Sequence, residues 1–118
     1  MSALLPSAAA MWRVGALSGA SSVLLGAFGA HALKSKLGEG SPLLATWATA
    51  SHYHLAHSGA ILIAAGAKQP LPAALFAAGT LLFSGSLYAL VLSGYKALGA
   101  VTPVGGLLLT AGWLALLL

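Results

Sequence analysis

The fold is decided by residues 14–30, which read VGALSGASSVLLGAFGA and contain no charged side chain. Arg13 precedes this run and Lys34 follows shortly after it. A helix needs about 20 mainly apolar residues to cross the hydrocarbon core of a bilayer. Because lipid cannot bond an exposed backbone amide, a helix is the structure expected for such a run. The sequence therefore predicts a membrane-spanning helix over residues 12–33.

The composition of the whole chain agrees with this interpretation. Of the 118 residues, 59% are hydrophobic and only 5% are charged, whereas soluble domains carry about 25% charged residues. Five cations and one acid are scattered singly between the apolar runs, which is typical of anchors at helix ends and not of a nucleic-acid surface. Cysteine is absent, so disulfides, thiolate metal ligands and thiol catalysis are excluded. The lipid bilayer is the expected partner, and nucleic acid is not.

Three more apolar segments follow, and each has proline near its start. Ser41-Pro42, Pro72 and Thr102-Pro103 are the start signals, because proline suits the first helical turn and serine or threonine caps it. We predict a tail over residues 1–11 and an all-α, four-helix transmembrane bundle over residues 12–118. The spans are predicted at about 12–33, 47–67, 72–92 and 100–118. The helix from Pro42 exceeds one span, which allows a short interfacial helical turn before the second span.

A signal-peptide interpretation of the first apolar run competes with a retained helix. Ala30-His31-Ala32 has the small-x-small pattern of a signal-peptidase site. The uncharged run before it, however, is longer than the usual apolar core of about 7–15 residues. A retained first helix is therefore favoured.

Small residues recur on the predicted helices at spacings that suit close helix packing. Gly15-x-x-x-Gly19 and Gly26-x-x-x-Ala30 lie in the first helix. Such pairs let two backbones approach, so that van der Waals contact drives association where lipid offers no hydrophobic drive. The candidate packing positions are Gly15, Gly19, Gly26, Gly29, Gly79, Gly85, Gly105, Gly106 and Gly112. Packing within the bundle is the leading interpretation, and a self-association face is the alternative.

Histidines lie within or near the predicted spans, where they are uncommon and often functional. At the rise of an α-helix, His57 lies roughly 16 Å from the interface marked by Lys68, near the midplane of the bilayer, and it alone is deep enough to need a buried partner. Thr80, Ser84 and Tyr88 recur every four residues on one face of the third helix. The candidate polar cluster consists of His31, His54, His57, Ser84 and Tyr88.

Three interpretations of this cluster compete. In the favoured one, His57 is a structural hydrogen-bonding group that pairs with Ser84, Tyr88 or a backbone carbonyl, because unpaired polar groups are costly in hydrocarbon. In the second, the histidines bind a metal or haem, although the only acid, Glu39, lies in a predicted loop. In the third, they line a pocket for a lipid head group, a quinone or a proton path.

A hydrolase is disfavoured, because no acid stands by to orient a histidine base and no nucleophile elbow is present. We predict no catalytic, cofactor or metal site, and we expect that the protein is not an enzyme.

Several segments resemble the transmembrane protein 256 family, whose bacterial relatives are YgdD-like small inner-membrane proteins. The segments run in order from Val14 to Leu118, and they are Gly26-Ala-Phe-Gly-Ala-His31, Tyr53-His-x-x-His57, Leu82-Phe-Ser-Gly-Ser-Leu-Tyr88, Thr102-Pro-Val-Gly-Gly106 and Gly112-Trp113. The resemblance implies a four-helix membrane protein without an established activity, mitochondrial in eukaryotes. It maps the family pattern onto His31 and His57, and His54 falls where relatives vary.

The leading functional hypothesis is a structural or accessory component of a larger, respiratory-type assembly in the mitochondrial inner membrane, with other membrane protein subunits as partners. Few residues lie outside the predicted spans, too few for a soluble working domain. The alternative is a bundle that binds a small ligand, a lipid or a quinone through His31, His54, His57 and Tyr88.

Overall fold

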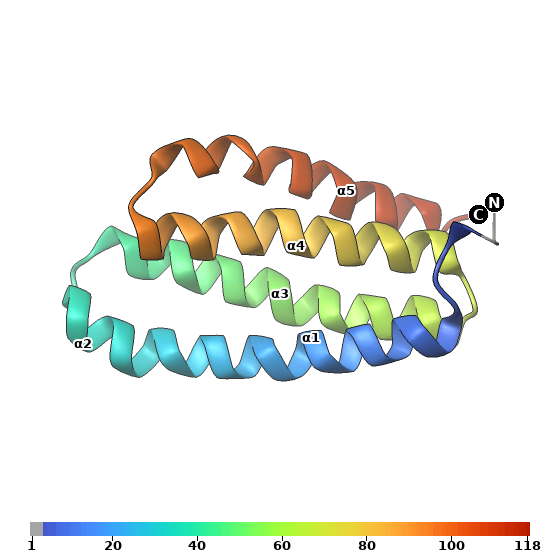
Figure 1. Ribbon diagram of the computed structural model, residues 1–118, viewed down its shortest axis with the longest axis horizontal. Coiled ribbons are helices and arrows are strands. Elements are labelled where there is room, and N and C mark those ends of the chain that lie inside the picture. The colour runs from blue at the N-terminus through green and yellow to red at the C-terminus, as the bar shows by residue number, and fades with distance from the viewer. Residues whose placement is uncertain (1–3) are drawn as a thin grey trace.

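A computed structural model describes residues 4–118, and residues 1–3 of the predicted tail lie outside the described residues. The chain forms helix α1 (Ala8–Phe28), a π-helical turn η2 (Gly29–Leu33), the short α2 (Lys34–Leu37), α3 (Pro42–Gly66), α4 (Pro70–Ser93), a 3-10 turn η3 (Lys96–Ala100) and α5 (Thr102–Ala115). The long helices lie side by side and alternate in direction, so that both ends of the described chain meet at one end of the molecule (Figure 1). The prediction of an all-α fold of four helices is confirmed.

The helix starts follow the capping chemistry of the sequence. The Ser41 hydroxyl accepts a hydrogen bond from the Leu43 amide at 3.3 Å, with Pro42 as the first residue of α3. Helix α1 starts at Ala8, inside the predicted tail, because the Ser7 hydroxyl caps the amide of Ala10 at 3.1 Å. A short helical turn, α2, does precede α3, but it continues the first helix instead of opening the second.

Three segments of the described chain are long and apolar enough to cross a membrane: Ala8–Leu37, Pro70–Ser93 and Lys96–Ala115. Helix α3 has 25 residues and is less apolar because it carries three histidines. It nevertheless crosses too, since α1 and α4 run in the same direction and α3 connects the end of one to the start of the other (Figure 1). The protein is an integral membrane protein with four membrane-crossing helices.

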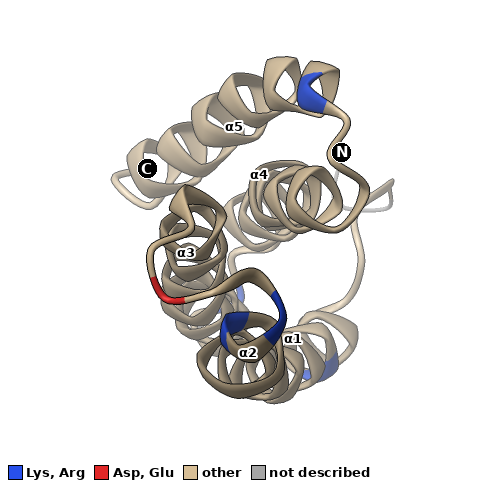
Figure 2. Ribbon diagram, turned by 90° about the vertical axis from the view of Figure 1, so that its left-hand side faces the viewer, with Lys and Arg blue, Asp and Glu red and all other residues tan. Residues whose placement is uncertain are grey.

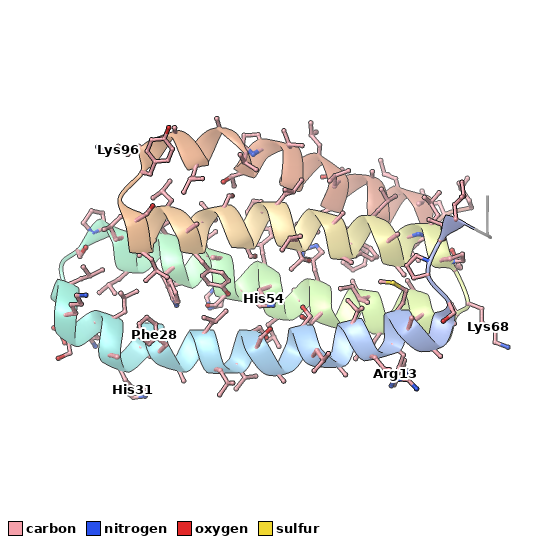
Figure 3. The ribbon with its side chains drawn as sticks, viewed as in Figure 1. Arg13, Phe28, His31, His54, Lys68 and Lys96 are labelled. Carbon is pink, nitrogen blue, oxygen red and sulfur yellow. The ribbon has the colours of Figure 1, made fainter. Side chains whose placement is uncertain are left out.

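Charged residues lie at the two ends of this helical assembly. Lys34 belongs to α2 and lies 3.3 Å from the Glu39 carboxylate in the following loop. Lys96 opens the segment that leads into α5 at the same end, whereas Arg13 and Lys68 lie toward the other end (Figures 2 and 3). Such a distribution leaves the middle of the helices to the hydrocarbon core.

The four helices form an open row. Helix α1 packs on α3, α3 on α4 and α4 on α5, while α1 and α4 touch at only a few positions. The view along the helices shows α5 crossing obliquely over α4, on the side away from α1 (Figure 2). Helix α3 therefore lies between α1 and α4 in the row.

Glycines stand where neighbouring helices approach most closely. A Cβ atom on Gly105 would overlap the Phe83 amide nitrogen, and one on Gly29 would lie 2.6 Å from the Trp47 indole nitrogen. Gly15, Gly79 and Gly112 are confined similarly, by Leu62, Leu109 and Phe76. The remaining candidates have only ordinary or distant neighbours, and they are Gly19, Gly26, Gly85 and Gly106. The tight contacts all lie within one chain, at the α1–α3 and α4–α5 crossings.

Candidate functional site

A cavity of about 300 Å³ lies where α1 and α4 separate, with α3 at its back. One group of its lining residues is apolar and includes Val14, Leu25, Ile61, Ala77 and Leu81. The other group is polar and uncharged, and consists of Ser18, Ser21, His54, Thr80, Ser84 and Tyr88. The cavity thus combines an apolar wall with a few hydrogen-bonding groups, as small-molecule sites do.

His54 joins the three helices around this cavity. Its Nδ1 atom lies 3.0 Å from the Tyr88 hydroxyl of α4, and its Nε2 atom lies 3.3 Å from the Ser21 hydroxyl of α1. Ser21 uses its single hydroxyl proton to bond the Ser18 carbonyl at 2.9 Å. His54 Nε2–H therefore donates to Ser21. A charged imidazole would be costly in a side chain that is 8% exposed within the membrane, so the ring is assigned as neutral, and Nδ1 then accepts from the Tyr88 O–H.

Two further hydroxyl contacts fix the helices at the same level. Ser58 donates to the His54 carbonyl at 2.6 Å, so the Ser18 hydroxyl, 2.6 Å from that of Ser58, is the donor in their mutual bond. The Ser84 hydroxyl of α4 donates to the Ala50 carbonyl of α3 at 2.7 Å. Each of these protons is committed within the protein, and hydrogen bonds of this kind tie adjacent membrane helices together.

Thr80 is different from its neighbours in the cavity wall. Its side chain is 7% exposed, and within residues 4–118 its hydroxyl has no hydrogen-bond partner. A buried hydroxyl without a partner costs about 1–3 kcal/mol. The hydroxyl oxygen itself is buried, so a molecule in the cavity does not reach it in this conformation of Thr80.

His57 lies outside this cavity, on the side of α3 that faces α5. Its Nδ1–H donates to the Tyr53 carbonyl at 2.8 Å, and its Nε2 atom accepts from the Trp113 indole N–H at 3.0 Å. Of the partners expected for it, Ser84 and Tyr88 are not among those it has, whereas a backbone carbonyl, that of Tyr53, is one of them. The oblique path of α5 brings Trp113 to α3, and it is His54 that takes Tyr88. The expectation that His57 alone needs a buried partner is wrong, because His54 is also buried and has partners on α1 and α4.

His31 lies apart from both histidines. It is exposed on the outer face of the first helix, and its side chain points away from the other helices (Figure 3). The structure therefore divides the candidate polar cluster. His54, Ser84 and Tyr88 line one cavity, His57 lies beside Trp113, and His31 lies outside.

Several residues at the site were not among the candidates from the sequence. Trp47 is 2% exposed, donates from its indole nitrogen to the Leu25 carbonyl at 2.7 Å, and lies 4.6 Å from the Tyr88 ring between ring centroids. Ser18 and Ser21 stand three residues apart on one face of an otherwise apolar helix. That spacing is a signal that could have placed them in a polar wall. Trp47 carries no comparable signal.

The protonation of His57 can be tested by nitrogen NMR. A carbonyl only accepts and an indole N–H only donates, so the His57 ring should be neutral with its proton on Nδ1. In bilayers, ¹⁵N-histidine spectra should show that tautomer, assigned by its loss in His57→Gln. Trp113→Phe should leave the proton on Nδ1, because the Tyr53 carbonyl still accepts it, should shift the Nε2 resonance, which loses its hydrogen bond, and should lower the unfolding free energy by about 0.6 and at most about 1.7 kcal/mol. An imidazolium signal, or a proton on Nε2, would contradict this geometry.

The chemistry offered by the described residues is that of neutral hydrogen bonds. Within residues 4–118, no three histidine, aspartate or glutamate side chains come together in a group that could hold a metal ion. The cavity wall contains hydroxyls, one neutral imidazole and apolar side chains. These groups can bind and orient an uncharged molecule.

Comparison with known proteins identifies the family. A family model described as a protein of unknown function, DUF423, matches residues 25–106, which include all of α3 and α4. The chain belongs to the DUF423 family. It is 39% identical to a UPF0382 membrane protein of Staphylococcus aureus over 89% of both chains. It is 37% identical to one from Schizosaccharomyces pombe, over 91% of this chain and 98% of the relative. The UPF0382 membrane protein YwdK of Bacillus subtilis is 36% identical, over 86% of this chain and 87% of the relative. No solved structure matches the chain.

The DUF423 match corrects the resemblance drawn from the sequence. The relatives found are UPF0382 membrane proteins, so the assignment to the transmembrane protein 256 family is wrong. The segments that suggested it are short and rich in glycine, alanine and serine. Such segments are common in closely packed membrane helices and do not separate one family from another. The membrane character is shared by the DUF423 relatives, whose names describe membrane proteins.

Proposed function

We propose that the protein binds a small amphipathic molecule from the bilayer in the cavity between α1, α3 and α4. The observation that carries this proposal is the wall of the cavity, where apolar side chains stand beside the uncharged polar groups of Ser18, Ser21, His54 and Tyr88. Small-molecule sites combine an apolar lining with a few polar groups in the same way. This function is the one that the sequence alone placed second.

The proposed role is binding without catalysis. The polar side chains around the cavity other than Thr80 are engaged in hydrogen bonds that join helices, as for His54 with Tyr88 and Ser21. Groups held in this way support a fixed pocket. The apolar part of the wall would hold the chain or ring of the ligand, and the polar part would hold its head.

A variant that fills the cavity can test this function. Gly85 lines the cavity, and a Cβ atom there would meet nothing closer than 4.0 Å, so Gly85→Leu should fold and occupy the space. Gly59 on α3 has no neighbour within 4 Å and does not line the cavity, so Gly59→Leu is the matched control. Native mass spectrometry of protein extracted from membranes in mild detergent should show a lipid-sized adduct on the wild type and on Gly59→Leu.

The adduct should be lost from Gly85→Leu. Wild-type protein without any adduct, or equal adducts on all three proteins, would rule out the proposed cavity function.

An accessory role in a larger membrane assembly is a second candidate, supported by the open helix row. Helices α1 and α5 each have one main neighbour, which leaves their other sides free for another subunit or for lipid.

We propose the mitochondrial inner membrane as the location only for a eukaryotic chain. Relatives in Staphylococcus and Bacillus work in cells without mitochondria, so a role common to the family cannot depend on that organelle. Native gels in mild detergent should show the protein in a large complex of respiratory size, and migration as a free monomer would exclude this role.

A further inference from the structure

A second hollow, of about 450 Å³, lies between the continuous helix α1–η2–α2 and α3, at the end of the molecule that carries Lys34. We call it the α1–α3 groove. It shares no lining residue with the α1–α3–α4 cavity, so it is a separate place on the protein. We infer that the α1–α3 groove binds an anionic phospholipid, with an acyl chain between the helices and the phosphate at Lys34.

The length of the groove matches one leaflet of a bilayer. Its lining positions on the first helix recur every three or four residues from Ser22 to Lys34. These residues cover roughly 18 Å at the rise of an α-helix, and half of the hydrocarbon core is about 15 Å thick. The groove therefore begins at one membrane interface and ends near the middle of the bilayer, as a lipid acyl chain does.

The inner part of the groove is apolar and open to lipid. Val23 and Leu55 are 61% and 54% exposed on its two sides. Gly26 lies between them, and a Cβ atom there would meet nothing closer than the Ser51 hydroxyl at 3.9 Å. The first helix and α3 are thus less tightly packed here than at Gly15 or Gly29. The space between them suits a flexible hydrocarbon chain.

The interface end of the groove carries a positive charge. Lys34 lines it, is 48% exposed, and lies 3.3 Å from the Glu39 carboxylate, which is itself 83% exposed. So exposed an ion pair is weak, which leaves the ammonium group available to a second anion. Glu39 is the only acid in the chain, whereas Lys34, Lys36 and Lys96 all lie at this end (Figure 2). Basic pockets between membrane helices bind anionic lipid head groups.

His52 adds a polar contact further into the groove. It is exposed and lines the wall on α3, whose N-terminal end lies at the Lys34 end of the molecule. Side chains lean toward the N-terminus of their helix, so the imidazole leans toward the lysine, and it carries an N–H in either tautomer. Lysine, histidine and apolar wall therefore follow one another in the order of the phosphate, the ester carbonyls and the acyl chain of a phospholipid.

A second copy of the chain fits the groove less well. Two copies inserted in one membrane have the same orientation, and a symmetric pair uses the same surface on both. Such an interface would bring two Lys34 side chains together at one level, with two Lys36 side chains nearby. Each copy has only Glu39 to offset them. The charge of the groove thus favours an anionic lipid.

Photolabelling at equilibrium in phosphatidylcholine nanodiscs can test this inference. The probes are phosphatidylglycerol and phosphatidylcholine with the same diazirine-bearing acyl chain, and mass spectrometry locates the labels. At Val23, Ala27 and Leu55 we expect phosphatidylglycerol to label about five-fold more than phosphatidylcholine, which corresponds to the attraction of about one lysine. Leu107 on α5 is 71% exposed, and both probes should label it equally as part of the surrounding lipid.

Charge variants locate the phosphate. Lys34→Gln should bring the labelling ratio of the two lipids at the groove close to one, and Lys34→Arg should preserve the preference for phosphatidylglycerol. Lys36→Gln is the matched control, because it removes the same charge from the same short helix but Lys36 does not line the groove. It should leave the ratio unchanged.

A filling variant locates the acyl chain. Gly26→Leu should fold, since a Cβ atom has room there, and should abolish labelling of the groove by both lipids. Gly59→Leu and Gly85→Leu lie outside the groove and should retain it. Because Gly85→Leu fills the other cavity, its result separates this inference from the proposed function.

Equal labelling of the groove by the two lipids, or a preference that survives Lys34→Gln, would overturn the assignment to an anionic lipid. Labelling that persists in Gly26→Leu would place the acyl chain elsewhere. Absence of labelling at the groove would also overturn the inference, and a dimer in the same nanodiscs would then identify a second copy of the chain as the occupant.

Discussion

Replacing Gly105 with alanine should lower the unfolding free energy by about 3 kcal/mol, whereas alanine at the adjacent Gly106 should leave it unchanged or raise it by up to about 1 kcal/mol. A Cβ atom on Gly105 would overlap the Phe83 amide nitrogen and lie 2.8 Å from the Leu82 carbonyl carbon. Both obstacles are backbone atoms of α4, which cannot move aside as a flexible side chain can. The helices α4 and α5 would have to separate.

Gly106→Ala is the matched control, because it makes the same substitution at the adjacent position. A Cβ atom there would lie 3.7 Å from the Phe83 ring, which is ordinary van der Waals contact. Alanine would then contribute only its higher helix propensity. Unfolding titrations with SDS in mixed micelles would give both free energies. Equal effects from the two substitutions would mean that α5 does not approach α4 as closely as the structure has it.

The separation of α4 and α5 would also affect His57. The Trp113 indole reaches His57 only because α5 crosses α4 closely. We therefore expect Gly105→Ala to break the Trp113–His57 hydrogen bond and shift the His57 Nε2 resonance, while Gly106→Ala leaves that resonance in place, a readout that does not depend on stability.

The fold was largely predictable from two properties of the sequence. Charge-free runs of spanning length gave four helices, and proline near Ser41 and Thr102 indicated where helices begin. The start of α1 was missed because Ser7 caps it from within a segment that lacks the apolar pattern. The oblique path of α5 was not predictable, because it depends on which glycines meet a backbone and which meet open space.

The candidate site was predictable only in part. Spacing alone placed Thr80, Ser84 and Tyr88 on one face of α4, and all three line the cavity. The same rule placed His54 and His57 together, although they face different neighbours. Residues three apart on a helix differ by about 60° around its axis, enough to direct one side chain toward α1 and α4 and the other toward α5. Choosing between those directions requires the positions of the neighbouring helices.

Trp47 connects the stability of the fold to the geometry of the cavity. Its ring lies against Gly29 of the first helix, with centroid distances of 5.5 Å to Phe28 and 4.6 Å to Tyr88. Its indole nitrogen bonds the Leu25 carbonyl. The Tyr88 ring, whose hydroxyl bonds His54, thus rests on a tryptophan that also joins α1 to α3. Trp47 is a positioning residue for the cavity, because no ligand needs to touch it.

Trp47→Ala should therefore lower the unfolding free energy by about 3–5 kcal/mol and, in protein that remains folded at low temperature, weaken the lipid-sized adduct seen by native mass spectrometry. Trp47→Phe keeps a ring against Tyr88 and loses only the indole bond, so it should cost about 0.6 and at most about 1.7 kcal/mol and retain the adduct. Trp12 is 51% exposed, and Trp12→Ala should change stability by no more than about 0.5 kcal/mol. SDS titrations and native mass spectrometry of the three variants measure both effects. If Trp47→Phe lost the adduct as completely as Trp47→Ala, ring packing against Tyr88 would not be what holds the cavity open, and the indole bond to Leu25 would have that role.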